Sequence, residues 1–266
     1  MHNIATIARN SAREILKQRS FLVVLALGIV AIFMGRYLTL FGLGMEVEMF
    51  KDIGTTTILF FGLLMVVFAS SSTIYDEIEN KTMLTILSRP VTKGEVLTGK
   101  FFGIVVTVTI AFAVLLAAFL LTHWWFLNFE YSHSIKEQPF FHPQIIKGVV
   151  LAYMQVLVLG GVSVIMSIFV GLLPNISVCG VVFVIGHLTD YIFSEFRDVV
   201  TNEINPVANF FYVLIPNLEH YNVSNALMTG IEIPTSYVLL AGTYTVAYIT
   251  VLLIIGNILF NRREVL

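Results

Sequence analysis

The sequence predicts an all-α membrane protein with six transmembrane helices in a single transmembrane domain over residues 1–266. Of these residues 57% are hydrophobic and 12% are charged, and the mean hydropathy is +0.88. Soluble domains carry about 25% charged residues, so this chain has too little polar surface to dissolve as a globule. Six apolar segments also reach the roughly 20 residues that a helix needs to cross a bilayer. The predicted spans cover residues 21–43, 53–75, 101–122, 145–172, 176–194 and 236–260.

An amphipathic helix is predicted over residues 4–19, before the first span. Apolar or small residues fall on one helical face, and these are Ile4, Ile7, Ala8, Ser11, Ala12, Ile15 and Leu16. Arg9, Arg13 and Lys17 are spaced by four residues on another face. This pattern favours a helix in the membrane interface with its basic residues toward anionic headgroups. The alternative is that residues 4–19 are a simple cytoplasmic extension of the first span. The first span itself is too long for the apolar region of a signal peptide, so we expect it to be retained.

The fourth and fifth spans are joined by the sequence LLPNIS. Pro174 disfavours helical geometry in the residue before it, and Asn175 is typical of turns. A single helix of about 50 residues would far exceed the thickness of a bilayer. We therefore predict two spans with a break at Pro174.

The distribution of Lys and Arg predicts that both termini are cytoplasmic. With six spans, ten of the 15 Lys and Arg residues fall on the side of the termini, and 11 of the 17 Asp and Glu residues fall on the other side. Cytoplasmic loops are enriched in Lys and Arg, which gives the orientation.

The net charge of −2 provides no general attraction to nucleic acid. The single cysteine, Cys179, has no second cysteine with which to form a disulfide.

The segment between the second and third spans, residues 75–100, is the most polar cytoplasmic part. Met83, Leu84, Ile86 and Leu87 form an apolar patch that is too short to cross a bilayer. Arg89-Pro90 then breaks this helix, because Pro disfavours helical geometry in the residue before it. The segment therefore predicts a short helix, a break and a second short helix that could dock on a cytoplasmic partner; the alternative is a solvated loop with some helix.

The segments on the outer side of the membrane support fewer structural predictions. Residues 123–144 contain Trp124, Trp125 and Phe126, which suit an aromatic belt at headgroup level. His123, His133 and His142 have no metal-ligand register there, so we expect loop histidines and no metal site. Residues 195–235 predict short helices at the outer leaflet and include a weak glycosylation match at residues 222–224. Within the spans, the polar residues Gln155, Ser163, His187 and Asn257 are candidates for lining an interface or a pathway.

Residues 94–100 have the spacing G-x-x-x-x-G-K of a nucleotide-binding phosphate loop. A working loop continues with Ser or Thr, whose hydroxyl holds Mg²⁺, but Phe101 follows here. The residues before Gly94 are polar and include a proline instead of forming a buried strand. We therefore predict that the match is accidental, that this chain has no catalytic residue, and that Lys100 anchors the third span.

The same stretch, YDEIENKTMLTILSRPVTKGEVLTGKFFG, resembles the segment that ABC-2 type transporter permeases share after their second span. That segment has a Glu, a Thr, a Leu-Leu-Ser-x-Pro-Val run, a basic residue and a Gly-Lys pair. The matching positions are Glu79, Thr82, Ile86, Leu87, Ser88, Arg89, Pro90, Val91, Lys93, Gly99 and Lys100. Lys81 departs from the pattern, because many members have Gly before the Thr. The terminal ILFNRREVL is also similar, and the branch that the chain resembles contains the nitrous-oxide-reductase maturation permease.

This resemblance implies the membrane subunit of an ATP-driven exporter or flippase-like transporter in the inner or plasma membrane. It implies a second permease chain, identical or different, and a separate ATPase subunit that binds ATP and Mg²⁺, while this chain binds no cofactor. Residues 76–99 would form a coupling helix on the ATPase, and residues 4–19 a connecting helix. The coupling residues would be Glu79, Thr82, Leu87, Ser88, Arg89, Pro90, Val91 and Lys93.

Functions of other classes have different sequence requirements. A non-transporting mechanical or regulatory subunit of an ABC complex would carry the same coupling segment. A secondary transporter would show internal repeats and interrupted helices at matching positions, which are not evident in the sequence. A membrane enzyme would show acids or histidines clustered at one face, and no such spacing is recognisable.

Overall fold

The structure is a computed structural model that describes residues 2–39, 45–83, 91–129, 143–194, 215–229 and 231–263. Six of its helical segments are long and apolar enough to cross a membrane, which confirms the all-α, six-span prediction. They are α2 (Arg19–Leu38), α3 (Glu46–Ser70) with its continuation, α6 (Lys93–Phe129), α7 (Pro143–Ser167), α8 (Leu172–Ser194) and α11 (Thr235–Arg262). The shorter elements are α1 (His2–Lys17), η2 (Ser71–Tyr75), α4 (Asp76–Glu79), η3 (Glu219–Tyr221) and α10 (Ser224–Thr229).

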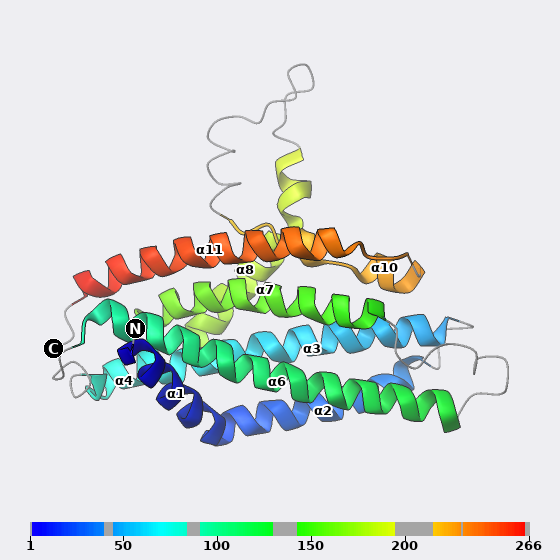
Figure 1. Ribbon diagram of the computed structural model, residues 1–266, viewed down its shortest axis with the longest axis horizontal. Coiled ribbons are helices and arrows are strands. Elements are labelled where there is room, and N and C mark those ends of the chain that lie inside the picture. The colour runs from blue at the N-terminus through cyan, green and yellow to red at the C-terminus, as the bar shows by residue number, and fades with distance from the viewer. Residues whose placement is uncertain are drawn as a thin grey trace, which may run out of the picture.

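Most of the long helices lie side by side along the longest axis of the molecule (Figure 1). Helix α3 contacts α2, α6 and α7, and α7 also contacts α11. Helix α8 stands at a steep angle to the others, and α1 crosses obliquely over α6. The marked N and C ends of the chain lie at the same end of the bundle as α4, as an even number of crossings requires.

Glycines let the core helices approach closely. At Gly54 and Gly62 of α3, an added Cβ would collide with the rings of Phe119 and Phe112 on α6. These phenylalanines are buried and form part of one apolar core. Membrane helices gain their association from such close contact, because lipid offers no hydrophobic advantage between helices. The small residues of α3 therefore set its distance from α6.

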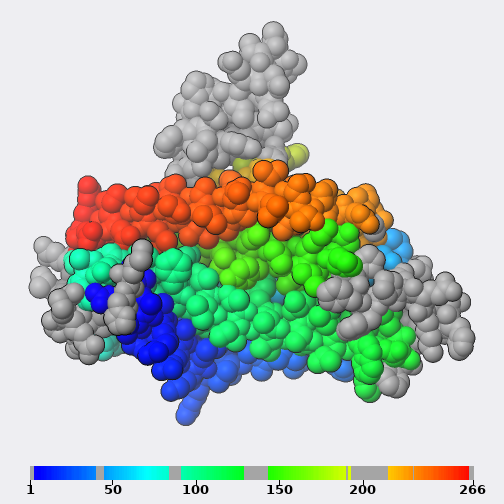
Figure 2. Space-filling view, viewed as in Figure 1, coloured from blue at the N-terminus to red at the C-terminus, as the bar shows by residue number. Residues whose placement is uncertain are grey.

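The outer faces of the bundle are apolar. Only 11% of the most apolar window of α11 is buried, and 28% of that of α2. Leu239 and Leu240 of α11 are each 68% exposed, and α11 runs along the surface of the bundle in Figure 2. Such continuous apolar surface is uncommon on soluble monomers, whereas a bilayer covers it. The chain is a multi-pass membrane protein.

The break between the fourth and fifth spans lies earlier than the sequence predicted. Helix α7 ends at Ser167 and α8 begins at Leu172, so Pro174 and Asn175 belong to the first turn of α8. A proline is tolerated in the first turn, because the N–H that it lacks would have no partner within the helix. The prediction of a turn at Asn175 was therefore wrong, and its amide is free to contact other helices.

Helix α6 is longer than the predicted third span and reaches Phe129. His123 is therefore a helix residue instead of a loop residue; it is buried and stacks on Phe50 with ring centroids 5.9 Å apart. Trp124 and Trp125 lie on the same helix and are 43% and 55% exposed. His133 and His142 lie outside the described residues, so the prediction about the three histidines is not tested as a set.

Candidate functional site

Four of the eight predicted coupling residues are described by the structure, and they lie close to the end of α4 or the start of α6. Glu79 is the last residue of α4 and is exposed, as is Thr82. Lys93 is the first residue of α6, and Val91 lies two residues before it. The other four predicted residues fall outside the part of the chain that the structure describes, and these are Leu87, Ser88, Arg89 and Pro90.

The predicted pair of short helices stays a prediction, because most of the first helix, with its apolar patch at residues 83–87, lies outside the described residues. Before that patch, α3 continues through the π-helix η2 into α4 without interruption. After the predicted break, residues from Lys93 onward form the beginning of α6, which runs through the third span. The physical reason is that hydrogen bonding continues from each span into the polar segment, so both flanks of the segment are rigid extensions of transmembrane helices.

The chain adopts the left-handed conformation two residues after the end of α4. Lys81 has φ 58°, and its N–H donates to the carbonyl of Ile78 over 3.1 Å. The hydroxyl of Thr82 donates to the carbonyl of Glu77 over 3.2 Å. This is the usual place for glycine at a helix C-terminus, which explains why the resembling family has Gly at this position. Lys81 adopts the same backbone at a steric cost.

Lys100 is the structural centre of this region. Its side chain is 1% exposed, and Nζ forms an ion pair of 2.5 Å with Glu77 Oε1. Nζ also donates to the carbonyl oxygen of Thr73 over 2.8 Å. Thr73 belongs to η2, where the π-helical bonding pattern alters the partners of the backbone; such π-bulges occur frequently at functional sites. We call these three residues the Lys100 junction, since they join α6 to the π-helix and α4.

The residues that match a phosphate loop have a different role in the fold. Gly94, Gly99 and Lys100 all lie within helix α6, whereas a phosphate loop lies between a strand and a helix. An added Cβ at Gly99 would lie 2.9 Å from Ile7 of α1, and one at Gly103 would lie 2.8 Å from the carbonyl oxygen of Ala8. The two glycines therefore allow α1 to pack closely against α6.

Helix α1 is amphipathic as predicted. Ser11, Ala12 and Ile15 are buried, and the apolar face packs on α6 and the core. The three basic residues predicted to face headgroups are exposed, namely Arg9, Arg13 and Lys17. Because its apolar face contacts protein, α1 is firmly attached to the third span. Its position in the membrane interface stays a prediction.

Further contacts tie the remaining helices to this end of the bundle. The Nζ of Lys93 donates to the carbonyl oxygen of Arg263 over 2.9 Å, which joins the start of α6 to the end of α11. The hydroxyl of Ser72 in η2 donates to Gln18 Oε1 over 2.9 Å, which joins η2 to the connection between α1 and α2.

Asn175 is the centre of a buried polar cluster that the sequence did not reveal. Its Nδ2 lies 3.0 Å from the hydroxyl of Ser71 and 2.9 Å from those of Ser163 and Ser167. Ser70 also hydrogen bonds to Ser163. The cluster connects α3, η2, α7 and α8, and all five residues are buried. Hydrogen bonds between side chains hold membrane helices together, so this cluster fixes the π-helix against α7 and α8.

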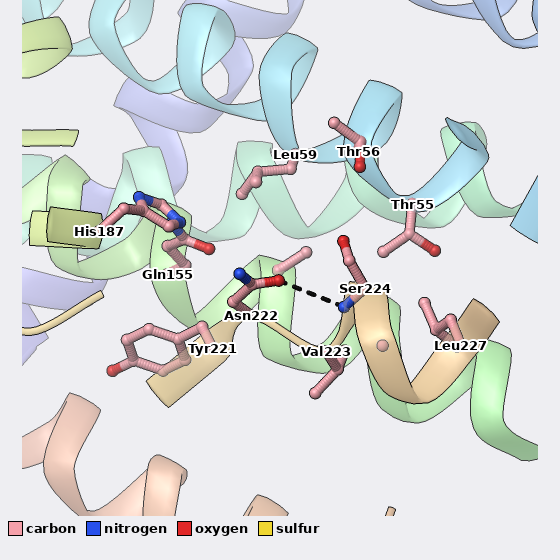
Figure 3. Close-up of a pocket in the computed structure, with 12 residues that line it drawn as sticks. Thr55, Thr56, Leu59, Gln155, His187, Tyr221, Asn222, Val223, Ser224 and Leu227 are labelled. Atoms are coloured by element: carbon pink, nitrogen blue, oxygen red, sulfur yellow. Dashed lines mark hydrogen bonds between the residues drawn. The ribbon is translucent and has the colours of Figure 1, made fainter. Parts of the chain in front are cut away.

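A second polar site lies toward the other end of the bundle, between α3, α7, α8 and α10 (Figure 3). It is a small cavity of about 50 Å³, partly open to the surroundings. Its polar lining residues are Thr55, Thr56, Gln155, His187, Tyr221, Asn222 and Ser224. Gln155 and His187 were predicted to line an interface or a pathway, and the structure brings them together at this pocket.

Each ring nitrogen of His187 has one hydrogen-bond partner. Nδ1 lies 2.8 Å from the carbonyl oxygen of Phe183, so Nδ1 carries a proton and donates it. Nε2 lies 3.2 Å from the amide nitrogen of Gln155, so Nε2 accepts. The same contact turns the amide oxygen of Gln155, a residue only 1% exposed, toward the pocket.

The outer wall of the pocket is anchored by Tyr221. The hydroxyl of Thr245 donates its proton to the carbonyl oxygen of Ala241. In the hydrogen bond of 2.7 Å between Tyr221 and Thr245, the tyrosine hydroxyl is therefore the donor. Burial raises the pKa of Tyr221 to about 12, so the hydroxyl remains a donor at physiological pH. Asn222, the first residue of the glycosylation match, is held by Glu219 and by the backbone of Ser224. The wall is therefore a fixed part of the structure.

Comparison with known proteins bears on the whole chain. Curated proteins give no significant match to it. The model of a protein family described as ABC-2 family transporter protein matches residues 5–265, and membrane domains of this family in general lack catalytic activity. Because the match covers nearly every residue, including the Lys100 junction and the pocket, the chain belongs to the ABC-2 family of transporter membrane proteins.

Proposed function

We propose that this chain is the permease subunit of an ATP-driven exporter and that a separate ATPase subunit, which binds ATP and Mg²⁺, grips the segment between α4 and α6. The observation that carries the proposal is the Lys100 junction. It joins the two helices that flank the segment through a buried ion pair and a backbone hydrogen bond. A force on the segment is therefore delivered to both spans together.

The way such a force would travel follows from the contacts. Helices in lipid move as bodies, because every backbone group must remain hydrogen bonded. Because Gly99 and Gly103 allow α1 to pack closely against α6, α1 would move together with α6. Lys93 links the same helix to the end of α11. The Asn175 cluster ties η2 to α7 and α8, so these helices would resist or share the movement.

The expected orientation puts the Lys100 junction on the cytoplasmic side. The end of the bundle that holds α4 and the marked chain ends also holds the start of α1 (Figure 1), the helix that carries Arg9, Arg13 and Lys17. An excess of Lys and Arg favours the cytoplasmic side. A second permease chain completes the transporter, and the resemblance to the branch of the nitrous-oxide-reductase maturation permease makes a relative of that system the first partner to try.

The proposal is tested with Glu79→Ala and Arg89→Ala in the complex with its ATPase. Charged pairs at an interface set recognition and docking, so we expect both variants to insert normally while ATP hydrolysis no longer responds to the permease. Thr250→Ala, an exposed position on α11, is the control. Full stimulation of hydrolysis in both charge variants would refute the assignment. Stimulated hydrolysis without movement of any cargo would identify a mechanical subunit instead of an exporter.

A further inference from the structure

We propose that a groove between α7, α8 and α11 holds one acyl chain of a membrane phospholipid. We call it the α8–α11 groove. It is lined by residues of all three helices, among them Met166, Val182 and Leu252, and by Ile215 and Pro216. Its volume of about 370 Å³ lies within the range of small-molecule sites, about 300–1,000 Å³. This lipid binding goes beyond the proposed function and does not depend on it.

The groove exists because α8 diverges from its neighbours. Helix α7 packs against both α8 and α11, whereas α8 stands at a steep angle to the other helices (Figure 1). The segment before η3 covers part of the space that results. The N–H of Leu218 donates to the carbonyl oxygen of Gly186 on α8 over 2.9 Å, and the N–H of Asn217 donates to the hydroxyl of Tyr244 on α11 over 3.1 Å. Pro216 is therefore held as a fixed cover between the two helices.

The chemistry of the lining excludes water and ions as occupants. Apart from the hydroxyl of Tyr248, every lining side chain in the described part of the chain is apolar. An apolar cavity stays dry, because a water molecule needs several polar partners. An ion in a space without a compensating charge is costly. The occupant that the lining suits is a hydrocarbon.

The position of the groove identifies the source of this hydrocarbon. Tyr248 and Leu252 lie near the middle of the 28-residue helix α11. The groove is partly open, and the residues beside its lining on α8 and α11, Val181 and Val251, are 57% and 54% exposed. The opening therefore faces the bilayer, whose interior at this depth consists of acyl chains.

The size of the groove favours an acyl chain over a helix of a second permease chain. One turn of an α-helix with its side chains, about 5.4 Å long and 10–12 Å wide, occupies more than about 400 Å³, so not even one turn fits. An apolar cavity of about 150 Å³ holds the six carbons of benzene, and at the same density the groove holds roughly 15 carbons. This is the length of a common acyl chain.

The test uses the full chain, without an ATPase, reconstituted with phosphatidylcholine that carries a diazirine in the middle of one acyl chain. The protein is then washed in a steroid-based detergent, which contains no acyl chain to compete, and is illuminated. Mass spectrometry maps the labelled residues and counts the retained lipids. We expect one phospholipid per chain and labels at Met166 and Leu252. Labels at Leu239 and Leu240, which are each 68% exposed and face bulk lipid, should be lost in the wash.

Two variants connect the retained lipid to the groove. Val182→Phe places a ring in the space, and each methylene group that the ring displaces should weaken retention roughly fourfold. Val178→Phe, on the same wall of the groove, is a second variant in case the first does not fold. Val181→Phe adds the same ring at the neighbouring exposed position and should retain lipid like the unsubstituted protein.

Several results would overturn the proposal. One is loss of the labels at Met166 and Leu252 together with those at Leu239 and Leu240. Another is equal retention in both groove variants and in Val181→Phe. Retention of a free fatty acid in place of the phospholipid would refute the assignment of the ligand, and labelling only after permease dimers are dissociated would show that a second copy fills the groove. Because the assay contains no ATPase, a retained phospholipid with failed coupling would refute the proposed function alone.

Discussion

Removing the positive charge of Lys100 is the sharpest perturbation of the Lys100 junction. In Lys100→Met the buried carboxylate of Glu77, which is 13% exposed, loses its ion-pair partner, and the carbonyl of Thr73 loses a donor. Removing one member of a buried ion pair typically costs about 3–5 kcal/mol. When Glu77→Gln is added, no buried charge remains without a partner, so we expect the double variant to recover at least about 2 kcal/mol.

The measurement is the free energy of unfolding of the four proteins of this double-mutant cycle in the same bicelles. Lys17→Met, at an exposed position of α1, serves as the control and should change stability by less than about 0.5 kcal/mol. If Lys100→Met costs less than about 1 kcal/mol, or if the double variant is as unstable as the sum of the single variants, the ion pair does not hold α4 to α6 and the reasoning fails.

Three further substitutions test other parts of the structure. Lys81→Gly should raise stability by about 1 kcal/mol, because Lys81 has φ 58° and glycine adopts that conformation without steric cost; an unchanged or lower melting temperature would contradict this. Gly103→Ala should cost about 1–3 kcal/mol and increase hydrogen exchange in α1, because its Cβ would meet the backbone of Ala8; Gly180→Ala, with nothing within 4 Å, is the matched control. Asn175→Leu should lower the free energy of unfolding by about 1–3 kcal/mol, because buried hydroxyls lose their shared partner, whereas the exposed Ser177→Ala on the same helix should have little effect.

The number and class of the helices could be predicted because bilayer thickness imposes a minimum length on every apolar segment. The ends of the helices could not, since they depend on contacts between distant residues. Pro174 is an example: its sequence context suits a turn, but the first turn of α8 accommodates it. The end of α6 is another, because His123 is held in the helix by stacking on Phe50 of α3.

The candidate site was predictable only in part. The resemblance pointed to Glu79, Thr82 and Lys93, which lie at the two flanks of the polar segment. The role of Lys100 was missed, because a lysine at the start of a span is usually an anchor, and its pairing with Glu77 spans 23 positions. The run of hydroxyl residues at 70–73 was the one sequence signal for the π-helix, since such side chains compete for backbone carbonyls. Nothing in the sequence marked Asn175 as their partner.

The central claim is that an ATPase contacts the segment between α4 and α6. The direct measurement places a photo-cross-linking residue at position 79 of the chain in the membranes of cells that express its ATPase, with position 229 on α10, also exposed, as the comparison. We predict a covalent product between position 79 and the subunit that carries the phosphate loop, and no such product from position 229. A product from position 229 alone, or from neither position while the two proteins co-purify, would contradict the account.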